Sequence, residues 1–431
     1  MRKQTHKLPG LVITNHEYLV PLDHLKPNAD KIKVFAREIV AAELQTNRDL
    51  PWLVFFQGGP GFPSPRPDTK SGWLKRAVKD YRVLLLDQRG TGLSTPVTFQ
   101  TLARFPTAKE QVEYLKNFRA DSIVLDAELI RKELLGPGSQ WTGLGQSYGG
   151  FCLTHYLCAA PEGLKEAIIT GGLPPVEAPI DDIYRATYRR VIDKNSGYYM
   201  RYPEDLDKAR EIVDYLFAHE VALPGGGRLT PRRFQQLGIS FGFSDGFEHV
   251  HYLLENAFVD GASGRELSYT FLRGFENALQ FETNPIYAIL HEAVYCQEEA
   301  SRWSAARVLA EYPDFEVSAG KPVLFTGEMI YPWMFDEYKY LQALKEAAEM
   351  LAAYDGWPRL YDAGKLQSSA VPSSAAVFYQ DMYVETSFSE ATGKLVPSMK
   401  LWITNEYEHN AIRADGEKVL DRLISMLRGE V

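Results

Sequence analysis

Short apolar runs alternate with amphipathic stretches over the first 170 residues of the chain. The runs contain few polar side chains, which is typical of strands buried on both faces of a parallel sheet. They occupy residues 52–56, 82–86, 141–144 and 167–170. Apolar residues at helical spacing fill residues 109–135, which predicts one or two amphipathic helices. The alternation favours a mostly parallel sheet with helices on both faces.

Two further regions extend this sheet. Residues 11–20 and 32–40 have β-like composition and are separated by a Pro/Asn/Asp turn region, which indicates an N-terminal antiparallel pair. Near the end of the chain, residues 374–379 and 400–404 are expected as strands and residues 417–428 as a closing helix.

The middle of the chain breaks this rhythm. Residues 175–370 are rich in aromatic and helix-forming side chains and contain few convincing parallel strands. The 431 residues exceed one ordinary domain of about 100–200 residues, and one core with an inserted cap fits better than two independent modules. We therefore expect a core formed by residues 1–174 and 371–431, with 175–370 as a helical cap domain.

Composition narrows the classes of partner. Hydrophobic residues make up 45% and charged residues 24%, which is typical of a soluble globular protein. The net charge of −9 disfavours nucleic acids and anionic membranes as partners. Three cysteines without metal-type spacing are expected to be reduced and mostly buried. With no signal-peptide pattern and no run of 18 apolar residues, we expect a cytoplasmic protein; its oligomeric state is left open.

A nucleophile motif lies between the strand at 141–144 and the following helical segment. Residues 145–149 read GQSYG, the G-x-S-x-G pattern of a nucleophile elbow in that strand-to-helix context. Small glycines allow the sharp turn that lifts the Ser147 hydroxyl clear of the sheet, and the N–H groups at the helix start stabilise negative charge nearby. The competing interpretation is a glycine-rich turn with an incidental serine.

A second glycine-rich loop, QGGPG at residues 57–61, follows the strand at 52–56. Glycines allow the backbone to approach a substrate carbonyl closely, so the N–H groups of Gly59 and Tyr148 are expected to form an oxyanion hole. A structural β-turn is the alternative.

His409 is the expected general base. It follows the last predicted strand and precedes the final helix. This position agrees with the chain order serine, acid, histidine that accompanies a G-x-S-x-G nucleophile elbow. The other eight histidines lie before the sheet, in the helix after the serine, or in the cap: His6, His16, His24, His155, His219, His249, His251 and His291. The four in the cap, His219, His249, His251 and His291, could approach a substrate but have no reason to sit at a strand end.

Asp381 is the preferred third member of the triad. It comes just after the strand at 374–379, where a carboxylate can orient the imidazole and stabilise its cation. Glu385, Asp336 and Glu328 are rivals; Glu385 lies further from the strand end, and Asp336 falls in the expected cap.

Four motifs together, QGGPG, DQRGTGLS (87–94), GQSYGG and the late EHN histidine, resemble the prolyl aminopeptidases, or proline iminopeptidases, of the α/β-hydrolase superfamily. The similarity spans nearly the whole chain. It implies an α/β-hydrolase fold with a helical cap after the sixth strand, a Ser147, Asp381 and His409 triad, and removal of N-terminal proline from small peptides.

The resemblance also implies cap glutamates that hold the free α-amine of the substrate, since a buried ammonium requires a negative partner. Three residues are candidates: Glu292, Glu255 and Glu328. Glu292 comes first because its surroundings, HEAVYC, resemble the longer members. The larger cap, and Glu408 in place of the usual glycine before the histidine, leave substrate specificity open.

Three functions follow from these residues. The leading one is a serine aminopeptidase that releases N-terminal proline through an acyl-enzyme. A carboxylesterase or lactonase with the same triad is the alternative, because fold and triad do not fix the leaving group. A non-catalytic binding protein is the third, although no triad member is missing. Epoxide hydrolysis is disfavoured by serine at the elbow, and no metal or organic cofactor is implied.

Overall fold

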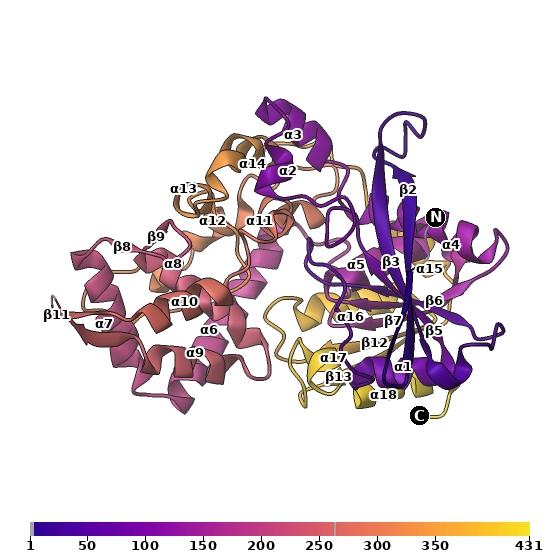
Figure 1. Ribbon diagram of the computed structural model, residues 1–431. Helices are drawn as coiled ribbons and strands as arrows, with labels where there is room; N and C mark the ends of the chain where they lie inside the picture. The colour runs from indigo at the N-terminus through magenta and orange to yellow at the C-terminus, as the bar shows by residue number, and fades with distance from the viewer. Residues whose placement is uncertain (1–3, 263) are drawn as a thin grey trace.

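The core of the protein is a single nine-stranded sheet with strand order β1-β2-β3-β5-β4-β6-β7-β12-β13 (Figure 1). The computed structural model describes residues 4–262 and 264–431. The strands of this sheet are β1 (Gln4–Leu8), β2 (Leu11–Pro21), β3 (Lys31–Ala41), β4 (Trp52–Phe56), β5 (Arg82–Asp87), β6 (Trp141–Gln146), β7 (Leu164–Thr170), β12 (Ser373–Phe378) and β13 (Met399–Thr404).

The sheet is antiparallel at its N-terminal edge and parallel elsewhere. β1, β2 and β3 pair antiparallel, and β3 pairs antiparallel with β5. All pairs from β5 to β13 are parallel. The predicted mostly parallel sheet and its N-terminal antiparallel pair are therefore confirmed.

Helices cover both faces because the central strands are apolar on both sides. In β4, Leu53 and Phe55 belong to one buried cluster, whereas Val54 and Phe56 belong to the other. The first face is covered by α1 (Gly72–Asp80), α17 (Ala411–Ala414) and α18 (Gly416–Arg428), and the second by α4 (Ala120–Leu135), α5 (Tyr148–Ala159) and α16 (Thr386–Leu395). A strand in which apolar and polar residues alternate exposes one face to water. The continuous apolar runs therefore correctly indicated strands covered on both faces.

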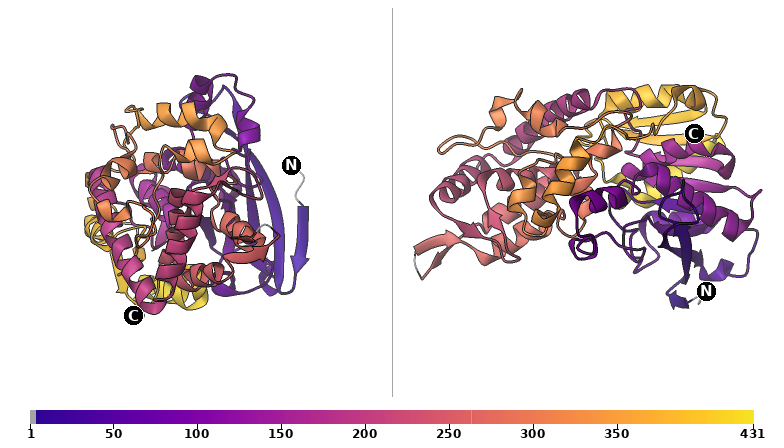
Figure 2. Two further views of the ribbon diagram at one scale, coloured as in Figure 1. Left: turned by 90° about the vertical axis from the view of Figure 1, so that its left-hand side faces the viewer. Right: turned by 90° about the horizontal axis from the view of Figure 1, so that it is seen from above.

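The segment between β7 and β12 forms a mostly helical lobe beside the sheet (Figures 1 and 2). β7 is the seventh strand in chain order because the short β1 precedes the expected N-terminal pair; without β1 it is the sixth, where the cap was expected. The strands between β7 and β12 form two short antiparallel hairpins, β8 (Val221–Ala222) with β9 (Arg228–Leu229) and β10 (Phe258–Gly261) with β11 (Gly264–Leu267). Domain limits at residues 174 and 370 stay a prediction.

The helices of this lobe vary in length from one turn to six. They are α6 (Ile180–Arg201), α7 (Asp205–Ala218), α8 (Pro231–Gln235), η3 (Gln236–Gly242), α9 (Gly246–Glu255), α10 (Tyr269–Ala278), α11 (Pro285–Ile289), η4 (Glu292–Val294), α12 (Ser304–Leu309), η5 (Pro313–Phe315), α13 (Met334–Glu337), η6 (Gln342–Leu344) and α14 (Lys345–Ala352). The last helix before β12, α15 (Ala363–Gln367), packs instead on α5 and α16 of the core (Figure 1).

Part of the N-terminal segment also joins the lobe. α2 (Phe99–Leu102) and α3 (Ala108–Leu115) rise beside α14, and α3 packs directly on it (Figure 1). The remaining short helices, η1 (Ala42–Leu44) and η2 (Pro161–Gly163), connect elements of the core.

Two compositional expectations bear on this fold. Cys152, Cys158 and Cys296 are all buried and unbonded, as predicted for reduced thiols. Across the part of the chain that the structure describes, every helix is too short or too polar to cross a bilayer.

Candidate active site

Ser147 occupies the turn between β6 and α5 in a strained backbone conformation, with φ 54° and ψ −125°. The glycines around it are required by packing. A Cβ on Gly145 would lie 2.4 Å from the Gly149 carbonyl oxygen, and one on Gly149 would lie 2.0 Å from that of Phe56. The G-x-S-x-G pattern thus has a steric cause, and it holds a serine in a conformation that costs about 1–3 kcal/mol.

Loops from two neighbouring strands fix the position of this serine. The Ser147 backbone N–H donates to the Thr170 carbonyl at the end of β7, at 3.0 Å. A Cβ on Gly172 would lie 2.2 Å from the Ser147 carbonyl oxygen, and one on Gly58 would lie 2.9 Å from the Ser147 Cβ. The nucleophile is therefore held by backbone on both sides.

The predicted base and acid meet directly. His409 Nδ1 lies 2.7 Å from Asp381 Oδ2, and the other Asp381 oxygen accepts the N–H groups of Tyr383 at 2.8 Å and Val384 at 3.0 Å. Both side chains are buried. A carboxylate held in this way orients the imidazole so that Nε2 is the nitrogen left for a substrate or for Ser147.

The cap also holds His409. Its backbone N–H donates to the Gly242 carbonyl of η3 at 3.2 Å. The Tyr383 ring packs on the imidazole with centroids 4.6 Å apart, and its hydroxyl donates to the Ile239 carbonyl, also in η3. The orientation of the base therefore depends on how the cap is seated on the core.

Two of the three rival acids lie away from His409, and the third, Glu328, lines the cavity described below. Glu385 immediately precedes α16 and accepts two hydrogen bonds from Arg190, at 3.0 and 2.9 Å. Asp336 is half-exposed and pairs with Lys345 at 2.5 Å. Of the four carboxylates considered from sequence, Asp381 is the one hydrogen-bonded to His409.

Ser147 and His409 line one cavity of about 230 Å³ between the core and the cap. Gly59 and Glu328 also line it. Its walls are largely aromatic and apolar: Phe62, Ile239, Phe243, Leu279, Phe281, Tyr287 and Tyr383. Within residues 4–262 and 264–431, neither Ser147 Oγ nor His409 Nε2 makes a hydrogen bond, so both remain available to a ligand.

The two N–H groups expected in the oxyanion hole border the same site. Tyr148 is the first residue of α5, so its N–H has no partner within the helix, and Gly59 has φ 132°. Neither N–H donates a hydrogen bond to any described part of the chain. Gln88 fixes the loop, because its side-chain amide donates to the Gln57 carbonyl at 3.0 Å.

The DQRG motif thus acts as a structural support. Asp87 accepts two hydrogen bonds from Arg66, at 2.7 and 2.6 Å, and Arg89 donates to Asp126 beneath the loop at 2.7 Å. Asp87 and Arg89 are thus each paired with a charge outside the motif, and neither lines the cavity.

Glu328 is a largely buried carboxyl at the cavity wall, with its side chain 14% exposed. The Tyr287 hydroxyl donates to its Oε1 at 2.5 Å, and His291 Nε2 lies 3.9 Å from its Oε2. Burial raises the pKa of Glu328 to about 7. The effect of burial is larger than the opposing effects of the Tyr287 hydrogen bond and of His409, which lower this pKa. Burial also lowers the pKa of His291 to about 4, so this histidine is neutral at pH 7 and supplies no positive charge to Glu328.

The other two expected anchors lie outside the cavity. Glu292 accepts the N–H groups of Ser304 at 3.2 Å and Ala305 at 2.9 Å, and so caps the start of α12. Glu255, at the end of α9, is half-exposed and 3.4 Å from His251. Only Glu328 of the three lines the cavity that contains Ser147.

Several cavity residues escaped the sequence analysis. Tyr287, Tyr383 and Arg413 line the cavity, and Gly242 binds the His409 backbone. Arg413 carried a weak signal, since it follows His409 by four positions. Tyr287 and Tyr383 had none, because aromatic residues are frequent along the chain. Gly242 had none either, because it binds through its backbone carbonyl.

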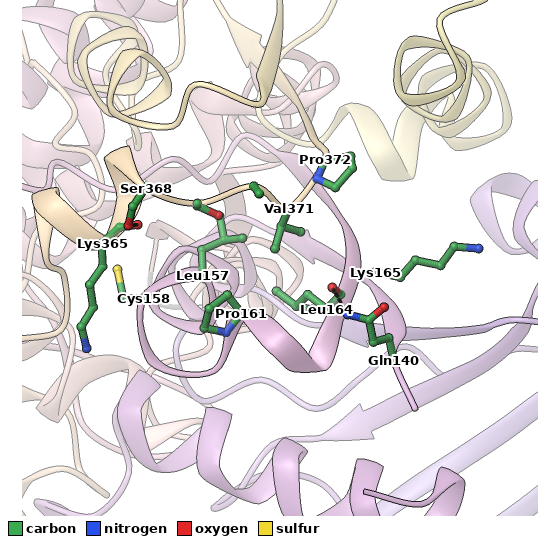
Figure 3. Close-up of a pocket in the computed structure, with 12 residues that line it drawn as sticks. Gln140, Leu157, Cys158, Pro161, Leu164, Lys165, Lys365, Ser368, Val371 and Pro372 are labelled. Carbon is green, nitrogen blue, oxygen red and sulfur yellow. Dashed lines mark hydrogen bonds between the residues drawn. The ribbon is translucent and has the colours of Figure 1, made fainter. Parts of the chain in front are cut away.

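A larger cavity, of about 660 Å³, lies at the amino ends of β7 and β12, opposite the strand ends that carry Ser147 and His409 (Figure 3). It is bordered by Leu164 and Lys165 at the start of β7, Pro372 before β12, and Cys158 in α5, with Lys365 and Lys165 on opposite sides. Ligands of open α/β sheets bind at the carboxyl ends of the strands. Burial raises the pKa of Cys158 to about 11, so this thiol is not an activated nucleophile.

Among the described residues, one group of side chains has metal-ligand spacing: Glu204, Asp205 and His251. Asp205 already accepts hydrogen bonds from Tyr198 at 2.5 Å and Lys208 at 3.0 Å, and lies 2.8 Å from His251. Its lone pairs are therefore used within the cap, and the group is an internal hydrogen-bond network.

The sheet order and the strand-turn-helix placement of Ser147 define an α/β-hydrolase. A family model described as alpha/beta hydrolase fold matches residues 51–195, which contain β4 to β7 and the serine.

Comparison with known proteins gives the narrower family. The chain is 47% identical to a proline iminopeptidase of Aeromonas sobria over 98% of both chains. It is 35% identical to one of Aspergillus aculeatus, over 98% of this chain and 95% of the relative. The chain therefore belongs to the proline iminopeptidase family and is a serine hydrolase of the prolyl aminopeptidase type. A solved proline iminopeptidase of Mycobacterium smegmatis covers 96% of this chain and 98% of its own, with 11% identity and a TM-score of 0.46, too distant to bear on the assignment.

Proposed function

We propose that this enzyme releases N-terminal proline from small peptides through a prolyl ester on Ser147. His409 Nε2 removes the proton from Ser147 Oγ, which attacks the prolyl carbonyl carbon. The carbon–nitrogen bond then breaks as the leaving amine takes the proton from His409. Water repeats the sequence on the ester and frees proline and Ser147. Asp381 stabilises the imidazolium that forms in each half-reaction.

The N–H groups of Gly59 and Tyr148 are proposed to bind the oxyanion in both tetrahedral intermediates. Both border Ser147, and neither donates a hydrogen bond to any described part of the chain. Preorganised backbone donors of this kind contribute about 3–4 kcal/mol each to transition-state binding.

The observation that carries the aminopeptidase proposal is a buried carboxyl in the cavity of the nucleophile. Among the described residues, the one cationic type within ion-pair distance of Glu328 is His291, which is neutral at pH 7. The protonated amine of an N-terminal proline supplies the missing positive charge, and the aromatic walls suit its pyrrolidine ring. The modest volume of about 230 Å³ favours one small residue on this side of the scissile bond.

The proposal is tested by the rates of cleavage of proline, alanine and leucine β-naphthylamides, N-acetyl-proline β-naphthylamide, and p-nitrophenyl acetate. We expect strong preference for proline with a free amine, and loss of all turnover in Ser147→Ala. Glu328→Gln should remove the preference for the free amine, whereas Glu255→Gln, a matched change on the exposed end of α9, should keep it. Cleavage of the ester alone would instead support an acyl hydrolase.

A further inference from the structure

Arg413 is an uncompensated cation at the wall of the catalytic cavity. It lies in α17, four positions after His409, and lines the cavity together with Ser147 and His409. Its guanidinium stacks on Phe243, another wall residue, 4.9 Å from the ring centroid. No carboxylate of the described chain lies within ion-pair distance of it, and its side chain makes no hydrogen bond there.

The cavity therefore contains one group of each charge. Within the described chain, the largely buried Glu328 has only the neutral His291 within ion-pair distance, and the exposed Arg413 has no carboxylate there. A peptide bound with its amine at Glu328 and its scissile carbonyl at Ser147 has its leaving residue on the remaining side. Arg413, close in sequence to the histidine that protonates the leaving amine, lies on the element expected to border that residue.

A second groove, of about 520 Å³, continues from the cavity past Arg413. The two share five wall residues: Gln57, Phe62, Gln146, Gln280 and Arg413. The lining of this groove includes Arg66 but neither aspartate nor glutamate, and Arg66 is already paired with Asp87. Arg413 is thus the guanidinium free to bind an anion at the junction.

On this basis, and resting on the proposed aminopeptidase function, we propose that Arg413 binds the free C-terminal carboxylate of the leaving residue. The preferred substrates are then dipeptides with N-terminal proline. In such a peptide the carboxylate lies about 4 Å from the scissile carbonyl, one residue spacing along the chain. An arginine fork binds a carboxylate through two parallel hydrogen bonds, and its planar face remains free to stack on Phe243.

The test compares kcat/KM for Pro-Ala with that for Pro-Ala-NH₂, which lacks the negative charge. For the wild type we expect a preference of about tenfold for the free acid, decreasing as salt is added because the site is open to solvent. Arg413→Met should bring the ratio to about one, and Arg413→Lys should retain part of it. Arg422→Met is the matched control, since Arg422 stacks on Trp402 and lines neither cavity.

Proline β-naphthylamide carries no carboxylate and separates the possible failures. Turnover of this substrate by Arg413→Met shows that the variant folds, and any general effect of the substitution cancels in the ratio of the two peptides. A wild-type ratio near one, or an unchanged ratio in Arg413→Met, would overturn the carboxylate site and leave the aminopeptidase function standing. No proline release from any amide would overturn the aminopeptidase function itself.

Discussion

His409 Nδ1 lies 2.7 Å from Asp381 Oδ2, although 28 positions separate the two residues in the chain. β12 ends just before the aspartate and β13 just before the histidine, and the two strands pair in parallel with Phe378 opposite Thr404. Parallel neighbours end at the same edge of a sheet, so the residues that follow them come together. The register of these two strands thus brings together the acid and the base of the proposed triad.

Replacement of Asp381 tests this arrangement. Asp381→Asn keeps an acceptor for the Tyr383 and Val384 N–H groups if the amide oxygen faces them, but it then presents an NH₂ group to His409. The imidazole tautomer is reversed, and we expect kcat on proline β-naphthylamide to fall by about 10³–10⁴-fold. Glu385→Gln, a rival acid paired with Arg190, should lower kcat by less than about tenfold. Similar losses in the two variants would contradict the assignment of the acid.

Activity should be as sensitive to substitution in the loop after β7 as to substitution in the proposed triad. In Gly172→Ala the new methyl group would lie 2.2 Å from the Ser147 carbonyl oxygen, so the elbow must shift. We expect a loss of at least about 100-fold in kcat/KM, because small displacements of a nucleophile are costly, together with a lower melting temperature. Gly138→Ala, where no heavy atom lies within 4 Å of the new Cβ, should match the wild type in both measurements.

Glu328 should make amine recognition depend on pH. Burial raises its pKa to about 7, so the carboxyl loses its charge as the pH falls below that value. We expect the ratio of kcat/KM for proline β-naphthylamide to that for p-nitrophenyl acetate to fall by up to about tenfold per pH unit below pH 7. Taking the ratio removes the ionisation of His409, which both substrates share. A flat ratio between pH 5 and 8 would exclude Glu328 as the amine anchor.

The same carboxyl should destabilise the folded protein at neutral and alkaline pH. Its pKa is about 7 in the folded state and 4.5 ordinarily, so the folded protein binds this proton more tightly than the unfolded chain. The cost of ionisation is absent below about pH 4.5 and complete above about pH 7, where it reaches up to about 3 kcal/mol. Glu328→Gln should therefore raise the melting temperature at pH 8 and change it little at pH 4.5. An equal change at both values would contradict this linkage.

Two ion pairs join α6 of the cap to the loops that carry the triad. Arg190 pairs with Glu385 at 2.9 Å, and the buried Lys194 pairs with Glu408, next to His409, at 2.5 Å. Removing one partner of a largely buried pair leaves the other charge uncompensated, so Lys194→Met should destabilise the protein by about 2–4 kcal/mol. The double variant Lys194→Met/Glu408→Gln should recover part of that loss in denaturant unfolding. Additive losses in the double-mutant cycle would show that the pair is not coupled.

The sequence by itself determined the features that depend on neighbouring residues. Apolar runs without alternation identified β4 to β7, and each was found within three residues of its expected limits. The role of the glycines around Ser147 could also be predicted from the sequence, because a sharp strand-to-helix turn leaves no room for a Cβ at those positions. His409 and Asp381 were chosen from position, since each comes after a predicted strand of a parallel sheet. The structure brings their side chains into contact, and their catalytic roles stay a prediction.

Only the tertiary structure decided which cap residues share the cavity. Glu292, the first choice from sequence, caps α12, whereas Glu328, also named as a rival acid, lies beside the nucleophile. Tyr287 and Arg413 reach the same cavity from segments more than 100 positions apart. Short helices of the cap carry charged residues on several faces, and which face turns inward depends on contacts between distant segments that no local pattern records.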